Sequence, residues 1–467
     1  MPERASLTTR TRVAPAVLAM PGDGHWDAGR RAFNLAVDQR PYAVALPRDA
    51  ADVAAVVRFA AERGLSVAAQ RTGHNAGPLG RLDHTILLRT DRMRSAPRID
   101  ARARQARVQA GAQWQDVIAA TSPVGLAALH GTAPDVGVVG YSLGGGLSWY
   151  GRKHGLAANH VTAIELITAD GRLVRADHDN DSDLFWALRG GGGNFGVVTA
   201  MEFELLPIRE VHGGALFFPW QRSAEVMTAW RAWTAGLPDE LTSLARLLAF
   251  PAAAEVPEPL RGNAYALVEA VHLGTRREAD ELLAPLRDLG PEIDTFVTTP
   301  PDGIQRLHMD PPAPVAYSGE GRLLADFPDR AIDDVVAAAG IGSDSPLSTF
   351  EVRHTGGALA RPGAGHGALD TLRGSFASFG AGILAGPRST RSLEHRLALV
   401  RDAVAAYDDG EYLNFTERPV HPSRFFSPAT LARLRRVKRD VDPDGVMRAN
   451  HAIAASSAER LHWSGRA

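Results

Sequence analysis

Two runs of glycine in the first half of the chain limit what it can fold into. One is Gly140-Tyr141-Ser142-Leu143-Gly144-Gly145-Gly146, preceded by Gly137, and the other spans residues 190–196. Glycine has no Cβ and adopts positive φ freely, so such runs form tight loops whose backbone N–H groups can approach a phosphate closely. A single loop of this kind is usually a turn between packed elements. Several in one region favour a large, phosphate-bearing cofactor.

The second run matches the dinucleotide pattern G-x-G-x-x-G at residues 191–196. A Rossmann site needs a strand before the glycines and a helix after them, because the helix N-terminus holds the pyrophosphate. Here the order is reversed. Ser182 or Asp183 is expected to cap a helix at 184–188, and the glycines lead into a β-rich run at 197–205. The sequence therefore disfavours a Rossmann NAD site.

Helix and strand signals alternate in the first 100 residues, which is typical of α/β architecture. Asp49 is a good N-cap for a helix with apolar residues at helical spacing, and Gly64 is a suitable stop. From about 100 to 206 strand signals dominate, with a hairpin turn at Asp170-Gly171. The expected strands are residues 65–69, 85–88, 107–110, 161–168, 173–175 and 197–205.

Glycine clustering largely ends after Pro207. In the part of the chain that follows, a helix is expected at 277–286 and strands at 348–355 and 376–384. This change in composition predicts a first domain over 1–207, divided near residue 100, and a second domain over 208–420. Residues 421–467 form a C-terminal segment with new turn signals.

Composition excludes several kinds of chemistry. The 467 residues include no cysteine, which rules out disulfides, thiolate metal sites and a cysteine nucleophile. Charges nearly cancel, with 51 Lys+Arg against 53 Asp+Glu, so nucleic acid is not an expected partner. The apolar run at 13–20 is interrupted by Pro15 and is short for a signal peptide, and no run reaches the roughly 20 residues of a membrane helix. We expect a soluble, cytoplasmic protein without a membrane partner.

The acidic residues do not predict a metal site. Asp177, Asp179, Asp181 and Asp183 resemble the start of a calcium loop, but Ser182 and Leu188 stand where glycine and glutamate are needed. His74 follows a strand within the turn 70–77, and its place beside Gly73 gives a functional and a structural role equal weight.

Five segments, in order along the chain, resemble the FAD-linked oxidases of the berberine-bridge-enzyme-like group, in the vanillyl-alcohol-oxidase superfamily. The pattern is most similar to the bacterial 6-hydroxynicotine oxidase-like type, which uses histidine alone to attach the flavin. The segments are residues 73–75; 134–146; 152–157; 183–196; and 412–415 together with Asp442-Pro443 and 448–450.

The resemblance implies an α+β fold, in which FAD lies extended between the two subdomains of a PCMH-type FAD-binding domain. A substrate domain with an antiparallel sheet covered by helices follows, and 421–467 returns to the FAD domain. The residues implied to bind FAD are His74, Arg71, Thr72, Gly73, Asn75, Gly77, Pro134, Asp135, Val136, Gly137, Gly140, Tyr141, Leu143, Gly144, Gly145, Asn194, Gly196, Val198, Tyr412, Asn414 and Asn450.

His74 matches the histidine that members of this group join covalently to the flavin 8α-methyl. Many members add a second bond from a cysteine, but that position is Ala133 here, so no cysteinyl bond can form. Val136 falls where a small side chain leaves room for dioxygen at the flavin, which favours an oxidase over a dehydrogenase. Gln70 and Thr72 depart from the usual residues of the histidine loop.

Phe415 stands where alcohol-oxidising members carry a tyrosine base. Because phenylalanine cannot accept a proton, an alcohol would need another base, whereas a neutral amine would need none. Alternation along 350–355 puts Glu351, Arg353 and Thr355 on one strand face. Glu351 and Arg353 could orient or polarise substrate there, or form an ordinary surface pair. Tyr412 is a further catalytic candidate, although it could simply pack beside the flavin, and His451 is another.

We therefore expect an FAD-dependent oxidase that transfers hydride from a small or medium organic substrate to the flavin, with dioxygen as the acceptor and hydrogen peroxide as the product. The substrate could be an amine, an alcohol or a secondary-metabolite scaffold. The alternatives are a dehydrogenase with another acceptor, a flavin-dependent cyclase or oxygenase, and a redox-silent flavin-binding protein. Substrate identity and oligomeric state stay open.

Overall fold

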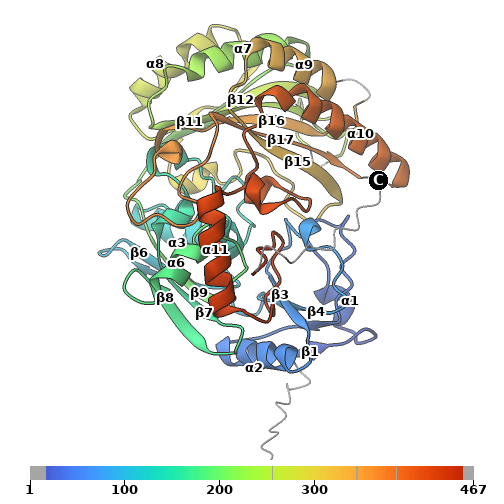
Figure 1. Ribbon diagram of the computed structural model, residues 1–467. Helices are drawn as coiled ribbons and strands as arrows, with labels where there is room; N and C mark the ends of the chain where they lie inside the picture. The colour runs from blue at the N-terminus through green and yellow to red at the C-terminus, as the bar shows by residue number, and fades with distance from the viewer. Residues whose placement is uncertain (1–16, 255, 343–344, 385, 456–467) are drawn as a thin grey trace, which may run out of the picture.

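Three β-sheets, each built from a different stretch of the chain, organise the molecule (Figure 1). The computed structural model describes residues 17–254, 256–342, 345–384 and 386–455, so the first half of the apolar run at 13–20 lies outside the described residues. The structure confirms the α+β class.

The first sheet has four strands in the order β1-β2-β4-β3, and β2, β4 and β3 run parallel. Between β2 and β3, helix α2 (Ala50–Ala61) buries the apolar face that its sequence predicts. The Asp49 side chain accepts a hydrogen bond from the Asp52 amide, as expected of an N-cap. The strands are β1 (Leu18–Ala19), β2 (Ala43–Ala45), β3 (Ser66–Gln70) and β4 (Thr85–Arg89).

The second sheet has five antiparallel strands in the order β5-β6-β9-β7-β8. The expected hairpin at Asp170-Gly171 joins β7 to β8, and Gly171 has φ +79°. The strands are β5 (Arg98–Asp100), β6 (Gln105–Gln109), β7 (Val161–Ile167), β8 (Leu173–Asp177) and β9 (Val197–Glu204).

Helix α6 (Ser182–Leu188) precedes the second glycine run and β9 follows it, as the argument against a Rossmann site expected. The predicted cap was wrong by one or two residues. The N-cap is Asp181, which has φ +48° and makes no side-chain capping bond. The other helices of this half are α1 (Trp26–Gly29), α3 (Trp114–Thr121), α4 (Val138–Leu143) and α5 (Gly151–His154).

The third sheet has eight strands, in the order β13-β10-β12-β11-β16-β17-β15, with β14 paired to β10. Helices α7, α8, α9 and α10 cover its outer face, and its other face is turned toward the first two sheets (Figure 1). The elements are β10 (Val211–Pro219), α7 (Ser223–Thr234), β11 (Leu241–Ala249), β12 (Ala264–His272), α8 (Arg276–Arg287), β13 (Ile293–Asp294), β14 (Val297–Thr299), β15 (Tyr317–Leu324), α9 (Asp329–Ala339), β16 (Thr349–His354), β17 (Phe376–Ile383) and α10 (Pro387–Ala403).

The chain then runs back past the first two sheets. Helix α11 (Pro428–Val441) packs beside α6, and the Val67 amide of β3 donates to the Val446 carbonyl. Residues 446–448 thereby cover the open edge of β3. The predicted boundaries at 207/208 and 420/421 stay predictions, although no strand of the three sheets crosses either one.

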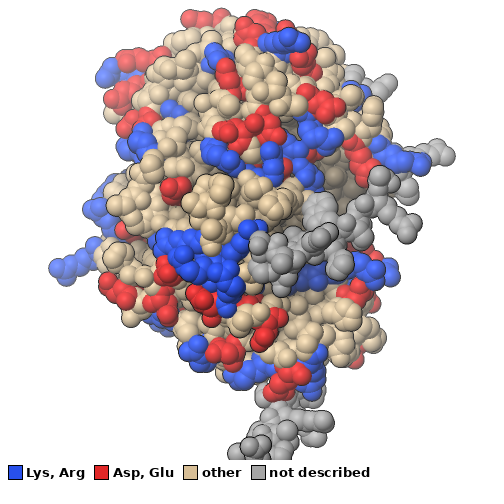
Figure 2. Space-filling model, viewed as in Figure 1, with Lys and Arg blue, Asp and Glu red and all other residues tan. Residues whose placement is uncertain are grey.

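Acidic and basic side chains are interspersed over much of the visible surface (Figure 2). Basic side chains gather over α11, whose sequence contains Arg433, Arg435, Arg436 and Arg439, a local patch that the balanced total charge did not predict. Arg433 is paired with Asp183 of α6. Among the described residues, no helix is long and apolar enough to span a membrane.

A buried ion pair ties the C-terminal segment to the second glycine run. Lys438 and Asp442, which are 4 % and 0 % exposed, form a salt bridge. The Lys438 ammonium also donates to the Asn194 carbonyl at 2.8 Å and the Met447 carbonyl at 3.1 Å. Asp442 accepts from the amides of Val446 and Met447 at 2.8 and 2.9 Å.

Replacing Lys438 with methionine should lower the free energy of unfolding by about 3–5 kcal/mol, because the Asp442 charge would stay buried without its ammonium partner. Urea unfolding of the holoprotein measures the change. Lys153→Met is the matched control, since Lys153 is the chain's other lysine and lies 3.5 Å from Glu240 at the surface. That exposed pair should contribute about 0–1 kcal/mol. Equal losses in the two variants would contradict this account.

Candidate functional site

His74 sits in a tight loop directly after β3. Gly73 has φ +79°, and a Cβ there would lie 2.9 Å from the Ala32 Cβ, so only glycine fits. The His74 ring stacks on Phe33 with centroids 3.7 Å apart, and its Nδ1 lies 2.8 Å from the Thr72 hydroxyl. Burial lowers the pKa of His74 to about 3. The imidazole is therefore neutral at physiological pH, with a lone pair on one ring nitrogen.

The neighbours of His74 in the sequence point in different directions. Arg71 is held by Asp91 at 2.8 Å and donates to the Gly111 carbonyl at 2.7 Å, so it braces the loop from the protein side. The Asn75 amide nitrogen donates to the Leu413 carbonyl at 3.0 Å. Its Oδ1 is buried and has no hydrogen-bond partner among the described residues.

The loop before α4 meets the His74 loop. The Asp135 carboxylate lies 3.9 Å from His74 Nε2, and burial raises the pKa of Asp135. A Cβ on Gly137 would come within 2.9 Å of the Arg71 Cγ. Backbone hydrogen bonds fix this loop against α3, because the carbonyls of Pro134 and Val136 accept from the amides of the first two residues of α3. These contacts bring two segments of the resemblance together.

The glycines of the two runs have two distinct uses. A Cβ on Gly144 would overlap the Asn414 amide, and one on Gly196 would meet the Ile167 carbonyl, so packing alone explains these positions. In contrast, a Cβ on Gly140 would have no heavy atom within 4 Å, and one on Gly192 or Gly193 would have none closer than 3.7 Å. The Gly192 amide donates to the Leu143 carbonyl, which joins the two runs. Open space therefore borders the backbone at Gly140, whereas Gly192 and Gly193 are in ordinary contact with their neighbours.

Tyr412 and Asn414 connect this region to the C-terminal part of the chain. The Tyr412 hydroxyl accepts from the Gly146 amide at 2.9 Å and from the Asn414 side chain at 3.0 Å. Asn414 also donates to the Tyr141 carbonyl at 3.0 Å. Burial raises the pKa of Tyr412 above its ordinary value. Tyr412 is therefore a neutral hydroxyl that holds the first glycine run, which is an unfavourable state for a proton acceptor.

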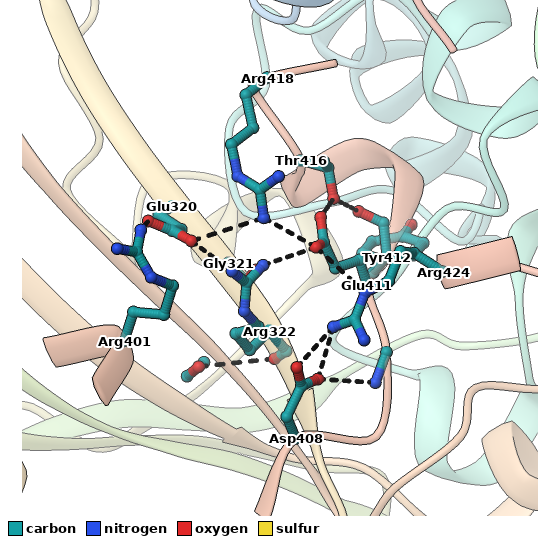
Figure 3. Close-up of polar contacts among 12 residues, drawn as sticks. Glu320, Gly321, Arg322, Arg401, Asp408, Glu411, Tyr412, Thr416, Arg418 and Arg424 are labelled. Atoms are coloured by element: carbon teal, nitrogen blue, oxygen red, sulfur yellow. Dashed lines mark hydrogen bonds and ion pairs between the residues drawn. The ribbon is translucent and has the colours of Figure 1, made fainter. Parts of the chain in front are cut away.

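A polar network holds the segment that carries Tyr412 (Figure 3). The Glu411 carboxylate is 3 % exposed and accepts from Arg322 at 2.7 Å and Arg418 at 2.8 Å. Arg424 lies 3.4 Å from the same oxygen, and the Thr416 hydroxyl donates to the other at 3.1 Å. Arg322 belongs to β15, so the network binds residues 411–418 to the edge of the third sheet.

Glu351 and Arg353 lie on the inner face of the third sheet, as the alternation predicts. Their neighbours Phe350 and Val352 pack into the core under the covering helices, so the two charged side chains point the other way. Glu351 is 2 % exposed and bonds the Arg353 Nε at 2.7 Å, which rules out an ordinary surface pair. The Arg353 guanidinium carbon lies 5.0 Å from the centre of the Phe415 ring. Phe415 in turn packs on Gly321 of β15 and beside Tyr412.

The sequence reasoning missed three buried charged residues beside this pair. His308 bonds Glu351 at 2.7 Å and Glu269 at 2.6 Å, and Arg246 lies 3.4 Å from Glu269. A signal existed for Glu269, which interrupts the apolar strand β12. His308 lies in a loop without any recognisable pattern, so nothing pointed to it.

Other predicted positions have mainly packing roles. Gly77 lies against the Glu417 carbonyl, and Val198 is 4 % exposed within β9. The Asn194 side chain bonds the backbone of residues 191, 451 and 453. The Asn450 side chain donates to the Asn75 carbonyl at 3.4 Å. His451 bonds the Leu413 carbonyl through Nε2, and its Nδ1 has no partner within the described chain.

The residues present fit an extended, phosphate-bearing flavin cofactor. The backbone at Gly140, beside open space, suits a phosphate group, and the unpartnered Asn75 oxygen suits a hydrogen-bond donor. His74, Asn75 and Gly140 would hold different parts of such a molecule. Within the described parts of the chain, no group of three or more metal-ligating side chains occurs.

Comparison with known proteins relates the chain to FAD-binding oxidases. Residues 41–177 match the family model described as "FAD binding domain". The chain is 28 % identical to (R)-6-hydroxynicotine oxidase of Paenarthrobacter nicotinovorans over 457 residues, which covers 93 % of this chain and 95 % of that protein.

Solved structures share the fold over nearly the whole chain. The crystal structure of 6-hydroxy-D-nicotine oxidase from Arthrobacter nicotinovorans superposes with a TM-score of 0.83 at 24 % identity, covering 96 % of this chain and 100 % of that one. The wild-type BBE-like 1 protein of Physcomitrella patens gives a TM-score of 0.79 at 20 % identity, covering 94 % of this chain and 97 % of that one. With an FAD binding domain over residues 41–177 and similarity to 6-hydroxynicotine oxidase over nearly its whole length, this chain is an FAD-linked oxidoreductase whose fold is shared with the berberine-bridge-enzyme-like structures.

Proposed function

We propose that this protein is an oxidase that carries FAD covalently on His74, oxidises a small or medium organic molecule and produces hydrogen peroxide. The observation that carries the covalent assignment is the half-buried, neutral His74 ring, stacked on Phe33 beside the loop that precedes the first glycine run. FAD, when bound, accepts a hydride from the substrate and passes two electrons to dioxygen. The similarity to 6-hydroxynicotine oxidase supports the oxidase assignment.

The side chains near Phe415 favour an amine over an alcohol substrate. Phe415 offers no proton acceptor, and the Tyr412 hydroxyl already accepts two hydrogen bonds. Both Glu351 oxygens are occupied, one by Arg353 and the other by His308. Burial raises the pKa of Glu351. Arg353 and His308 lower this pKa by more than burial raises it, so it lies well below the usual range of a glutamate. Since no strong base faces the site from these residues, a substrate oxidised as the neutral amine fits best.

Alcohol oxidation is the second candidate. Arg353 is a fixed cation on the inner face of the sheet, and it could stabilise an alkoxide or polarise a hydroxyl group without accepting a proton itself. The proton would then pass to water.

His74→Ala should abolish covalent attachment of the flavin, because the chain has no cysteine to form a second bond. The measurement is the fraction of flavin that stays with the protein after acid precipitation, with peptide mapping by mass spectrometry. His178→Ala is the control, since that side chain is 87 % exposed in a surface turn. Covalent flavin retained in His74→Ala would refute the attachment site.

Val136→Ile should slow reoxidation by dioxygen by about tenfold, which corresponds to about 1.4 kcal/mol in the barrier, if the extra methyl fills the oxygen site. The holoprotein is reduced with dithionite under nitrogen and mixed with aerated buffer in a stopped-flow instrument. Val136→Ala, which leaves that space open, should reoxidise at the wild-type rate. An unchanged rate in the isoleucine variant would remove Val136 from the oxygen route.

An anaerobic panel separates amine from alcohol chemistry. We expect 6-hydroxynicotine enantiomers or related cyclic amines to bleach the flavin absorbance, and cellobiose and simple alcohols to bleach it at least about tenfold more slowly, a difference of about 1.4 kcal/mol. Bleaching by the alcohols alone would overturn the amine assignment. A flavin that only dithionite reduces would indicate a redox-silent protein.

A further inference from the structure

Three neighbouring strands and one loop gather five charged side chains on the inner face of the third sheet. In the antiparallel register, Leu244 of β11 lies opposite both Glu269 of β12 and Arg353 of β16, and Arg246 lies opposite Glu351. Residues directly opposite share a face, so all four charged side chains point to the same side. The fifth is His308, which follows the short helix Pro301–Ile304.

His308 is the centre of this cluster. Its Nδ1 lies 2.6 Å from a Glu269 oxygen, and its Nε2 lies 2.7 Å from a Glu351 oxygen. An ionised carboxylate can only accept hydrogen bonds, so both ring nitrogens must donate, which requires the imidazolium form. Arg246 and Arg353 lie beside the two carboxylates and keep them ionised.

The cluster ends at Arg353. The Glu351 oxygen that is not bonded to His308 binds the Arg353 Nε at 2.7 Å, and the Arg353 guanidinium lies over Phe415. Phe415 follows Tyr412 and Asn414, which bond the first glycine run. A continuous chain of contacts thus leads from Glu269, through His308 and Glu351, to a guanidinium held against the segment that borders the cofactor loops.

We propose that His308 and Glu269 are positioning residues, which hold Glu351 ionised and thereby fix the Arg353 guanidinium where it contacts the substrate. We call the chain of contacts from Glu269 through His308 to Glu351 the bridge. The contact between Arg353 and substrate rests on the proposed function, whereas the bridge itself does not. Glu351 is then a support for Arg353 and not the base of the reaction. Glu269 contacts His308 and Arg246 but neither Arg353 nor Phe415, so a change at Glu269 reaches Arg353 only through its neighbours in the cluster.

The bridge should respond to alkaline pH. The charged groups that face His308 are Arg246 of β11, Glu269 of β12, Glu351 and Arg353 of β16, and Asp310 of its own loop. Burial and Arg246 lower the pKa of His308, but Glu269, Asp310 and Glu351 outweigh them and raise it from 6.5 to about 9. The folded state therefore holds the proton more tightly. The stabilisation is complete below pH 6.5 and is lost as the pH rises through about 9.

The protonation state can be read without substrate or turnover. Holoprotein with ¹⁵N-labelled histidine should show a doubly protonated imidazole at about pH 8, where the buried His130 and the half-buried His354 are neutral. His308→Gln should remove this signal, and Glu269→Gln should make it titrate at lower pH. His212→Gln, at a buried histidine in β10 of the third sheet, is the control and should leave it intact.

The position of Arg353 can be read by its reactivity toward phenylglyoxal, mapped by peptide mass spectrometry on the holoprotein. At about pH 8, Glu269→Gln and His308→Gln should each raise the modification rate of Arg353 about tenfold, a factor equal to about 1.4 kcal/mol. Arg152 and Arg322, which are buried elsewhere, should stay protected, since general loosening would expose them as well. In the wild type, the reactivity of Arg353 relative to the exposed Arg361 should rise as the pH passes about 9.

Absence of an imidazolium signal in the wild type at about pH 8 would overturn the proposal. So would an Arg353 reactivity that neither variant changes, because the bridge would then not hold the guanidinium. If both readouts succeed but no substrate of the panel reduces the flavin, the proposed function fails and the bridge stands.

Discussion

The segment 411–416 is the physical constraint on which the site depends. Tyr412 and Asn414 bond the first glycine run. Glu411 is held by Arg322 of β15 and by Arg418, just after the segment. Tyr412 and Asn414 therefore join the segment to the first glycine run, and Glu411 joins it to the third sheet. Because Glu411 is buried, leaving its charge without its guanidinium partners would be costly. That cost holds the segment, and with it the first glycine run, in a fixed position against the third sheet.

The glycines near this segment show why a glycine-rich sequence does not map directly onto cofactor contacts. Gly144 makes room for Asn414 and Gly196 for the β7 backbone, so their conformations serve packing. The Gly140 backbone lies next to open space, as a close approach to phosphate requires. Both uses need the absence of a Cβ. They differ only in what fills the space, which is another part of the protein in one case and is left for a ligand in the other.

Strand alternation in the third sheet puts apolar side chains on one face and a cluster of charged side chains on the other. Its outer face packs apolar side chains under four helices, and its inner face carries the Glu269, His308 and Glu351 cluster. Burying several charges is costly unless each is paired and hydrogen-bonded, and here every carboxylate meets at least two donors. Such an arrangement serves no packing purpose that a leucine would not serve better. Arg353 joins the cluster to Phe415, which supports the positioning role proposed for it.

The sequence alone determined the local elements and the loops that carry the chemistry. Asp49 caps its helix, Asp170-Gly171 makes its hairpin, and alternation along β16 puts Glu351 and Arg353 on one face, because capping, turn and pleat geometry depend only on near neighbours. The motif order likewise predicted FAD, which the match to an FAD binding domain supports, and His74 as its attachment site, which stays a prediction. Only the tertiary structure decided that Glu351 is clamped between His308 and Arg353, and that Tyr412 holds a glycine loop. Those contacts join residues far apart in the chain, and no local pattern encodes which side chains a folded core brings within hydrogen-bonding distance.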